Sequence, residues 1–287
     1  MVPELDKEIS GEQLGTAVAV VNGVGFHTEV YCAVLWSLVQ VRANVSAFVA
    51  TDRTSGIEEV IKDWYPQPFQ DFADFLPLAC EFSAVLFVPV FPINTGTPEA
   101  SSRSGFVLQG LLQEHRRNYT AIFEGIQRTP ALMQGEGVVL TLIGHGDLLI
   151  PAPLQGKVVK RTSLNYKEYY SVIRGALAVL PAFASPIYLT HKASSSVAAA
   201  IISGTPLLAD EALLRAYSYL PRHAVFEAVA GEHEASAMAR VAAHSDEAED
   251  KARALAALRD ELYEANQRIM AELLCVPLTD SPSSPNC

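Results

Sequence analysis

Residues 164–210 constrain the fold most, because they read as helix, short strand, loop, helix and strand in close succession. At their centre are three consecutive serines, Ser194, Ser195 and Ser196, which begin an apolar helix that ends at Gly204. The segment after that helix has the composition of a buried strand ending in an acid. Free backbone N–H groups point outward at a helix start, and the helix dipole favours negative charge there. If the chain binds a phosphate-bearing ligand, the sequence predicts that it binds at these serines.

Short apolar segments rich in β-branched residues alternate with segments of helical periodicity along the rest of the chain. In the first part we expect strands at 16–21, 44–50 and 84–90, with helices at 27–41 and 54–64. Further on we expect strands at 106–109, 138–143, 158–161, 177–180, 206–209 and 224–229, with helices at 118–127, 166–174 and 212–219. Strands and helices that alternate with short connections indicate an α/β fold with parallel sheets of the Rossmann type.

Residues 93–103 form the best domain boundary, because they are rich in Pro, Gly, Ser and Thr and contain almost no apolar residues. We therefore expect one Rossmann-like domain over 1–92 and a second over 104–275. Residues 232–274 read as helix, with a break near 244–246 that divides it in two. The polar tail, 276–287, is expected to be disordered.

Composition and charge exclude several function classes. The chain has 287 residues, 49% of them hydrophobic, so it can bury a sizeable core. Its formal net charge of −11 argues against nucleic-acid binding, which needs a basic surface. The four cysteines have no CxxC or metal-ligand spacing, which favours a reducing compartment. The N-terminus is polar and acidic, unlike a signal peptide, and no apolar run reaches the length of a membrane span. We expect a cytoplasmic protein.

Four segments, taken in order, resemble the donor domain of a GT-B glycosyltransferase of the family 4 type. FVLQGLLQEHRRNYTAIFEGI resembles its opening strand, basic turn and helix, and VVLTLIGHG resembles the following strand and its Gly-x-Gly turn. VVKRTSLNYKEYYSVIRGALAVLPAF resembles the segment that passes under the nucleotide base. KASSSVAAAIISGTPLLAD resembles the donor-loop helix followed by a Gly-x-Pro strand. The resemblance covers most of 104–230 and matches the first domain only loosely.

The resemblance implies two Rossmann-like domains facing a cleft, with C-terminal helices crossing back. It also implies transfer of a sugar, in the manner of a hexosyltransferase, from a nucleotide-diphosphate sugar to an unknown acceptor. That donor would be a co-substrate, and the chain would need neither a metal nor another cofactor.

Two departures from the family keep other functions open. Lys192 stands near the place of the first of the two glutamates that usually flank the donor helix, and the helix contains no glutamate. The first domain is also short for an acceptor domain. A non-catalytic nucleotide-sugar sensor, or a subunit that binds a protein partner through the acidic helices of 232–274, is therefore the alternative. A sugar-nucleotide epimerase on the same fold is a third reading.

In the second domain, several side chains are candidates for holding the donor diphosphate. The three serines would cradle it with hydroxyl and backbone N–H groups, although a serine there also serves as an ordinary N-cap. Arg116 and Arg117 would pair with phosphate oxygens, or else lie in a solvated turn. Lys192 would offset charge on the leaving diphosphate, or else be a solvated loop lysine.

A glycine turn, an acid and a histidine complete the set of candidates. Gly144 and Gly146 would let the backbone approach the ligand, or simply form a tight turn around an exposed His145. Asp210 would bind sugar hydroxyls, or cap the next helix. His27 opens the first helix, and its pKa near neutrality suits a general base, with Glu29 or Asp52 as its orienting partner; otherwise it is a helix-start histidine without a role.

Overall fold

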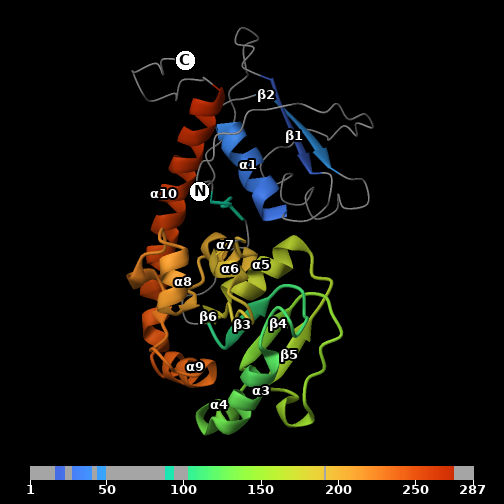
Figure 1. Ribbon diagram of the computed structural model, residues 1–287, viewed down its shortest axis with the longest axis vertical. Coiled ribbons are helices and arrows are strands. Elements are labelled where there is room, and N and C mark those ends of the chain that lie inside the picture. The colour runs from blue at the N-terminus through green and yellow to red at the C-terminus, as the bar shows by residue number, and fades with distance from the viewer. Residues whose placement is uncertain are drawn as a thin grey trace.

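The computed structural model describes residues 17–22, 28–40, 44–49, 88–93, 103–190 and 192–274. Every pair of neighbouring strands among them is parallel, and helices connect the strands. The expected α/β class with parallel sheets and C-terminal helices is confirmed (Figure 1).

Within 103–274 the strands follow the doubly wound order. A four-stranded sheet has the order β5-β4-β3-β6, and a bridge between Val179 and Leu207 joins its β6 edge to the pair β7-β8. The strands are β3 (Phe106–Gln109), β4 (Leu140–Ile143), β5 (Val158–Arg161), β6 (Ala178–Val179), β7 (Leu208–Ala209) and β8 (Phe226–Glu227). If β3 is numbered 1 and the five strands after it 2 to 6 in chain order, the order across the sheet is 3-2-1-4-5-6. It reverses between β3 and β6, and in open α/β sheets ligands bind at the carboxyl ends of the strands at such a reversal.

Helices cover both faces of this sheet. They are α3 (Tyr119–Arg128), α4 (Pro130–Gln134), α5 (Tyr166–Arg174), α6 (Ile187–Thr190), α7 (Ser195–Ser203) and α8 (Glu211–Ala216), with short 3-10 turns at Ala152–Leu154 and Arg222–Ala224. In β3, Phe106 and Leu108 pack with α3, whereas Val107 points to the other face and packs with α5 and α7. This alternation along a buried strand produces two hydrophobic cores, one on each face of the sheet.

The C-terminal helices divide at the place that the sequence predicts. Helix α9 (Glu234–Ala243) ends at His244, a 3-10 turn follows at Ser245–Glu247, and α10 runs from Ala248 to Leu274. Figure 1 shows α10 running from beside α8 and α9 to α1 (Thr28–Gln40). Near its far end, the Asn266 side chain donates a hydrogen bond of 2.8 Å to the Val88 carbonyl. Helix α10 thus ties the second part of the chain to the first.

The described elements of the first part agree with the sequence. Strands β1 (Ala17–Asn22) and β2 (Asn44–Val49) pair in parallel around α1, which buries Leu35 and Leu38. Of the strand expected at 84–90, only residues 88–90 are described, and they form no ladder; Pro89 among them has no N–H to donate to one. The helix expected at 54–64, most of the boundary at 93–103 and the tail at 276–287 lie outside the described residues.

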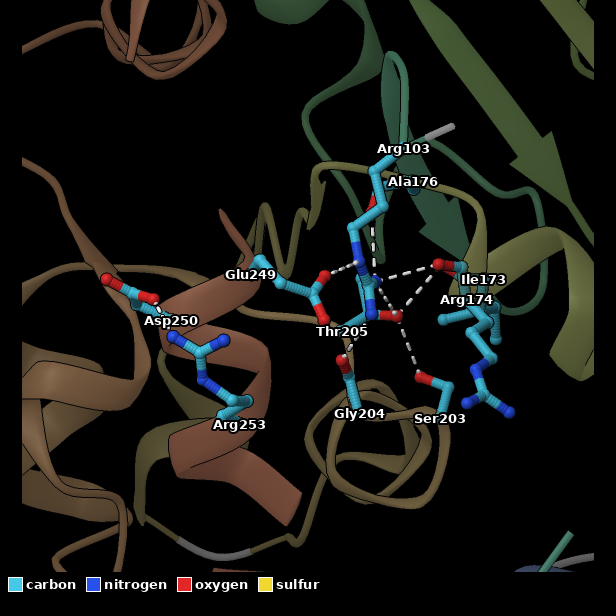
Figure 2. Close-up of polar contacts among 10 residues, drawn as sticks. All are labelled: Arg103, Ile173, Arg174, Ala176, Ser203, Gly204, Thr205, Glu249, Asp250 and Arg253. Carbon is cyan, nitrogen blue, oxygen red and sulfur yellow. Dashed lines mark hydrogen bonds and ion pairs between the residues drawn. The ribbon is translucent and has the colours of Figure 1, made fainter. Parts of the chain in front are cut away.

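One arginine fastens the C-terminal ends of two helices. The guanidinium of Arg103 donates to the carbonyl of Arg174, which ends α5 (2.7 Å), and to that of Gly204, which caps α7 (3.2 Å). Its Nε lies 3.6 Å from a carboxylate oxygen of Glu249 in the first turn of α10 (Figure 2). The last carbonyls of a helix lack partners inside it and carry partial negative charge, so a cation is stabilised there. Arg103 therefore locks α5, α7 and α10 together.

Candidate ligand-binding site

The first turn of α7 lies beside the carboxyl end of β3. Gln109, the last residue of β3, donates from its side-chain amide to the hydroxyl of Ser195 (3.2 Å) and to that of Ser196 (2.9 Å). These contacts place the serine-rich helix start, singled out from the sequence, at the topological switch point between β3 and β6. The fold and the helix terminus thus indicate the same location for a ligand.

Arg117 is a buried cation at this helix start. Its residue is 6% exposed, and its guanidinium donates to the Ser196 hydroxyl (3.2 Å) and to the Arg116 carbonyl (3.1 Å). Its buried Nε has no hydrogen-bond partner, and no carboxylate of the described residues forms an ion pair with it. Burial lowers the pKa of Arg117, with Arg116 lowering it further, while Tyr119 and Tyr188 raise it. A positive charge therefore lies at the positive end of a helix dipole, and none of the described residues places an acid there to balance it.

Two aromatic rings hold the Arg117 side chain in place. Phe183 and Tyr188 stack at a centroid distance of 5.0 Å, and the guanidinium carbon lies 5.0 Å and 5.4 Å from their respective ring centres. Arg117 and Phe183 also form an antiparallel backbone bridge between the loop after β3 and the loop after β6. Cation–π contacts of this kind stabilise an arginine without neutralising its charge.

The three serines have three different roles. Ser194 is the N-cap, since its hydroxyl accepts from the Ser196 N–H at 3.2 Å, and its own N–H donates to the Tyr217 hydroxyl at 2.9 Å. Ser196 is fully buried between Gln109 and Arg117. Ser195 is partly exposed, and its N–H has no protein partner among the described residues. Of the three, Ser195 is the one whose donors are available to a ligand.

The other predicted residues of the loops lie around this centre with less contact to it. Arg116 is exposed, and its side chain donates to the Tyr188 hydroxyl at 3.4 Å, whereas Lys192 is exposed and forms no side-chain hydrogen bond or ion pair with the described residues. A Cβ on Gly144 would lie 1.8 Å from the Gly110 carbonyl oxygen, and one on Gly146 would lie 2.4 Å from that of Leu112. Both glycines have φ near +144° and are required where the loops after β3 and β4 touch.

Three further candidates are placed as follows. His145, between the two glycines, is exposed. Asp210 caps α8, because its side chain accepts from the Leu213 N–H at 2.7 Å, which is the alternative role expected for it. His27 and Asp52 lie outside the described residues, so the catalytic base stays a prediction.

Sequence reasoning missed Gln109. The available signal was a polar amide ending an otherwise apolar buried strand, at the strand end where α/β proteins bind ligands. Among the described residues there is no group of three or more His, Cys, Asp or Glu side chains that could hold a metal ion. No helix in the described part of the chain is long and apolar enough to cross a membrane.

Comparison with known proteins gives remote structural neighbours only. No family model matches the chain, and no curated protein matches it. Among solved structures, it resembles WaaG, a glycosyltransferase involved in lipopolysaccharide biosynthesis (13% identity, TM-score 0.42, 83% of this chain and 64% of that one). It also resembles a UDP-forming α,α-trehalose-phosphate synthase from Burkholderia xenovorans (9%, 0.41, 61% and 44%). A third neighbour is the lipopolysaccharide outer core galactosyltransferase WaaB (15%, 0.39, 87% and 73%).

These neighbours are GT-B glycosyltransferases, the class that the sequence motifs resemble. The chain spans 44% and 64% of the length of the first two. At such identities and TM-scores the likeness carries nothing about substrate or site residues, so the function has to be argued from the site itself.

Proposed function

We propose that the chain is a metal-independent glycosyltransferase that holds the diphosphate of a nucleotide sugar at the first turn of α7. The observation that carries the proposal is the buried Arg117 guanidinium at the positive end of α7, unpaired with any carboxylate of the described residues. Such an arrangement is unfavourable in the free protein and becomes favourable when an anion binds.

The chemistry of sugar transfer fits these donors. As the bond between the anomeric carbon and the diphosphate breaks, negative charge grows on the leaving diphosphate. Arg117, the Ser195 N–H and the Ser195 hydroxyl are donors fixed before the reaction, and such preorganised donors stabilise developing charge without reorganisation. They would take the part that a divalent cation plays elsewhere. The acceptor would approach from the first part of the chain, where His27 is the predicted base.

The first test measures binding. Nucleoside diphosphates (UDP, GDP, ADP and dTDP) are titrated by calorimetry into the wild type, Arg117→Met and Arg116→Met, with and without EDTA. Arg116 is the matched control, since it has the same charge on the neighbouring residue but is exposed. We expect one diphosphate to bind wild type and Arg116→Met similarly, independent of EDTA, and Arg117→Met at least about 30-fold more weakly, the effect of one charged hydrogen bond.

The second test measures turnover. Release of the nucleoside diphosphate from the matching nucleotide sugar is followed with candidate acceptors, in wild type and His27→Ala. Turnover that falls in His27→Ala supports the base. Donor binding without release would favour the non-catalytic sensor, and no diphosphate binding at all would remove the donor site.

A further inference from the structure

Gln109 contacts two hydroxyl groups of the candidate site, the partly exposed one of Ser195 and the buried one of Ser196. It is 4% exposed, and its side-chain nitrogen is within hydrogen-bond distance of both Ser195 Oγ and Ser196 Oγ. A glutamine amide carries two N–H hydrogens, so one hydrogen serves each serine. Both hydrogens of the amide group are therefore used in hydrogen bonds to the two hydroxyls.

The hydrogen bonds that each serine oxygen accepts determine where its own hydrogen can point. A serine oxygen accepts through two lone pairs and donates one hydrogen. Ser196 Oγ accepts from Gln109 and from Arg117 Nη2, so both of its lone pairs are engaged. Ser195 Oγ accepts from Gln109, so its hydrogen is directed away from the amide. Ser196 Oγ can therefore act toward a further group only as a donor, whereas Ser195 Oγ offers its hydrogen and one remaining lone pair.

We propose that Gln109 is a positioning residue that holds the Ser195 hydroxyl with its hydrogen directed toward a bound pyrophosphate group and, as a neutral side chain, leaves the Arg117 charge for that ligand. This inference rests on the proposed function and extends it to a residue that touches the ligand only through the serines. The Ser195 N–H and O–H groups and the Arg117 charge then suit the acceptor oxygens of pyrophosphate.

A glutamate at position 109 would have nearly the same shape as glutamine, but it would accept hydrogen bonds from the serines instead of donating to them. Its carboxylate would accept from both serine hydroxyls and would lie beside Arg117, since Gln109 and Arg117 already contact the same Ser196 oxygen. The buried cation would then have the carboxylate partner that none of the described residues gives it. Gln109→Glu should therefore stabilise the free protein while it abolishes the attraction for an anion. A residue that only supports the fold would not change these two properties in opposite directions.

The experiment uses the full chain and three variants, Gln109→Glu, Gln109→Met and Gln113→Glu. Gln113 is the matched control, because it lies on the same loop but is exposed, so Gln113→Glu adds the same charge away from the serines. Melting temperature is measured without ligand, and Kd is measured for UDP and for inorganic pyrophosphate. Circular dichroism checks that each variant is folded.

We expect the Gln109→Glu protein to melt no lower than wild type and to bind both probes at least about 30-fold more weakly, the effect of a reversed and charged contact. Gln109→Met should bind about 5- to 10-fold more weakly, the effect of freeing the hydroxyls from one neutral donor. Gln113→Glu should change neither property beyond about twofold.

Several outcomes separate this inference from the proposed function. If wild type binds UDP and Arg117→Met does not, but Gln109→Met binds like wild type, the diphosphate site stands and the positioning role is wrong. If wild type binds pyrophosphate without binding any nucleoside diphosphate, and Gln109→Glu loses that binding, the positioning role stands and the glycosyltransferase proposal fails. Wild type that binds neither probe overturns both, as does a Gln109→Glu protein that melts lower and binds pyrophosphate like wild type.

Discussion

Arg103 and Arg117 lie at opposite ends of the same helix, α7, and their surroundings differ in kind. Arg103 contacts the C-terminal end, where helix carbonyls accept from it and Glu249 provides a negative charge. Arg117 contacts the N-terminal end, where the helix dipole opposes a cation and the described residues offer no carboxylate. Burial lowers the pKa of both arginines, but only Arg103 has an acid, Glu249, that raises it again.

The difference separates an arginine that stabilises the fold from one placed for a ligand. A buried charge costs free energy unless partners compensate it. At the C-terminal end of α7 the chain supplies those partners itself. At the other end the described residues supply two aromatic rings, the Arg116 carbonyl and one hydroxyl, which hold the guanidinium but include no carboxylate. An anionic ligand would provide the negative charge that compensates Arg117. Without that ligand, we expect the uncompensated charge to lower the stability of the protein.

The largest expected effect is on stability, in Arg103→Met. This change leaves the carbonyls of Arg174 and Gly204 and the Glu249 carboxylate without their donor, and unsatisfied buried groups are costly. We expect the free energy of unfolding to fall by about 2–4 kcal/mol in urea titrations. Arg253→Met is the control, because Arg253 pairs with Asp250 at the surface (Figure 2) and should cost less than about 1 kcal/mol. Equal losses in the two variants would contradict the clamp.

Arg117→Met should have the opposite pattern. Ligand affinity should fall by about 2–3 kcal/mol, while the free energy of unfolding without ligand stays unchanged or rises, because an unbalanced buried cation is replaced by an apolar side chain of similar length. Urea unfolding with and without the bound nucleoside diphosphate measures both quantities. If Arg117→Met without ligand lost as much free energy of unfolding as Arg103→Met, both arginines would serve to stabilise the fold.

The hydroxyl groups at the two ends of α7 offer a smaller version of the same comparison. Ser195→Ala removes a donor from the candidate site and should weaken diphosphate binding by about 1 kcal/mol with little change in stability. Ser203→Ala removes bonds to the Ala199 carbonyl and to Thr205 in a buried turn, and should cost about 1 kcal/mol of stability without affecting binding. Calorimetry and urea titration on both variants test the pair. An exchange of the two effects would contradict the assignment of the ends.

The sequence predicted the elements well because their signals are local. The strand at 158–161 and the helix at 166–174 have the expected bounds, and the helix expected at 118–127 runs from Tyr119 to Arg128 with Asn118 as its N-cap. The serine run also marked the helix start correctly. Each of these signals is a periodicity or a cap that can be read within a dozen residues.

The roles of single polar residues could not be predicted in the same way, because their partners are distant in sequence. Gln109 acts on serines 86 and 87 positions away, and Arg103 binds carbonyls 71 and 101 positions away. Arg116 and Arg117 are adjacent and looked equivalent, yet only the second turns inward, because the Phe183 bridge fixes the loop there. Register between loops, which no local pattern encodes, decides which arginine is buried.

The smallest effect concerns Arg240, an arginine that does have a titrating partner. Its hydrogen bond to Glu232 lowers the pKa of that carboxyl from its ordinary value of 4.5. A carboxyl with a lowered pKa contributes stability that is present above pH 4.5 and is lost as the pH falls through the lower folded value. Glu232→Gln should therefore be less stable than wild type by about 0.5–1 kcal/mol at neutral pH, with the gap closing below pH 4.5 in urea titrations.

The stability difference between Arg117→Met and wild type should stay constant over the same pH range, because no acid of the described residues pairs with Arg117. A gap for Arg117→Met that closed in acid would reveal a carboxylate partner and so remove the contrast between the two ends of α7.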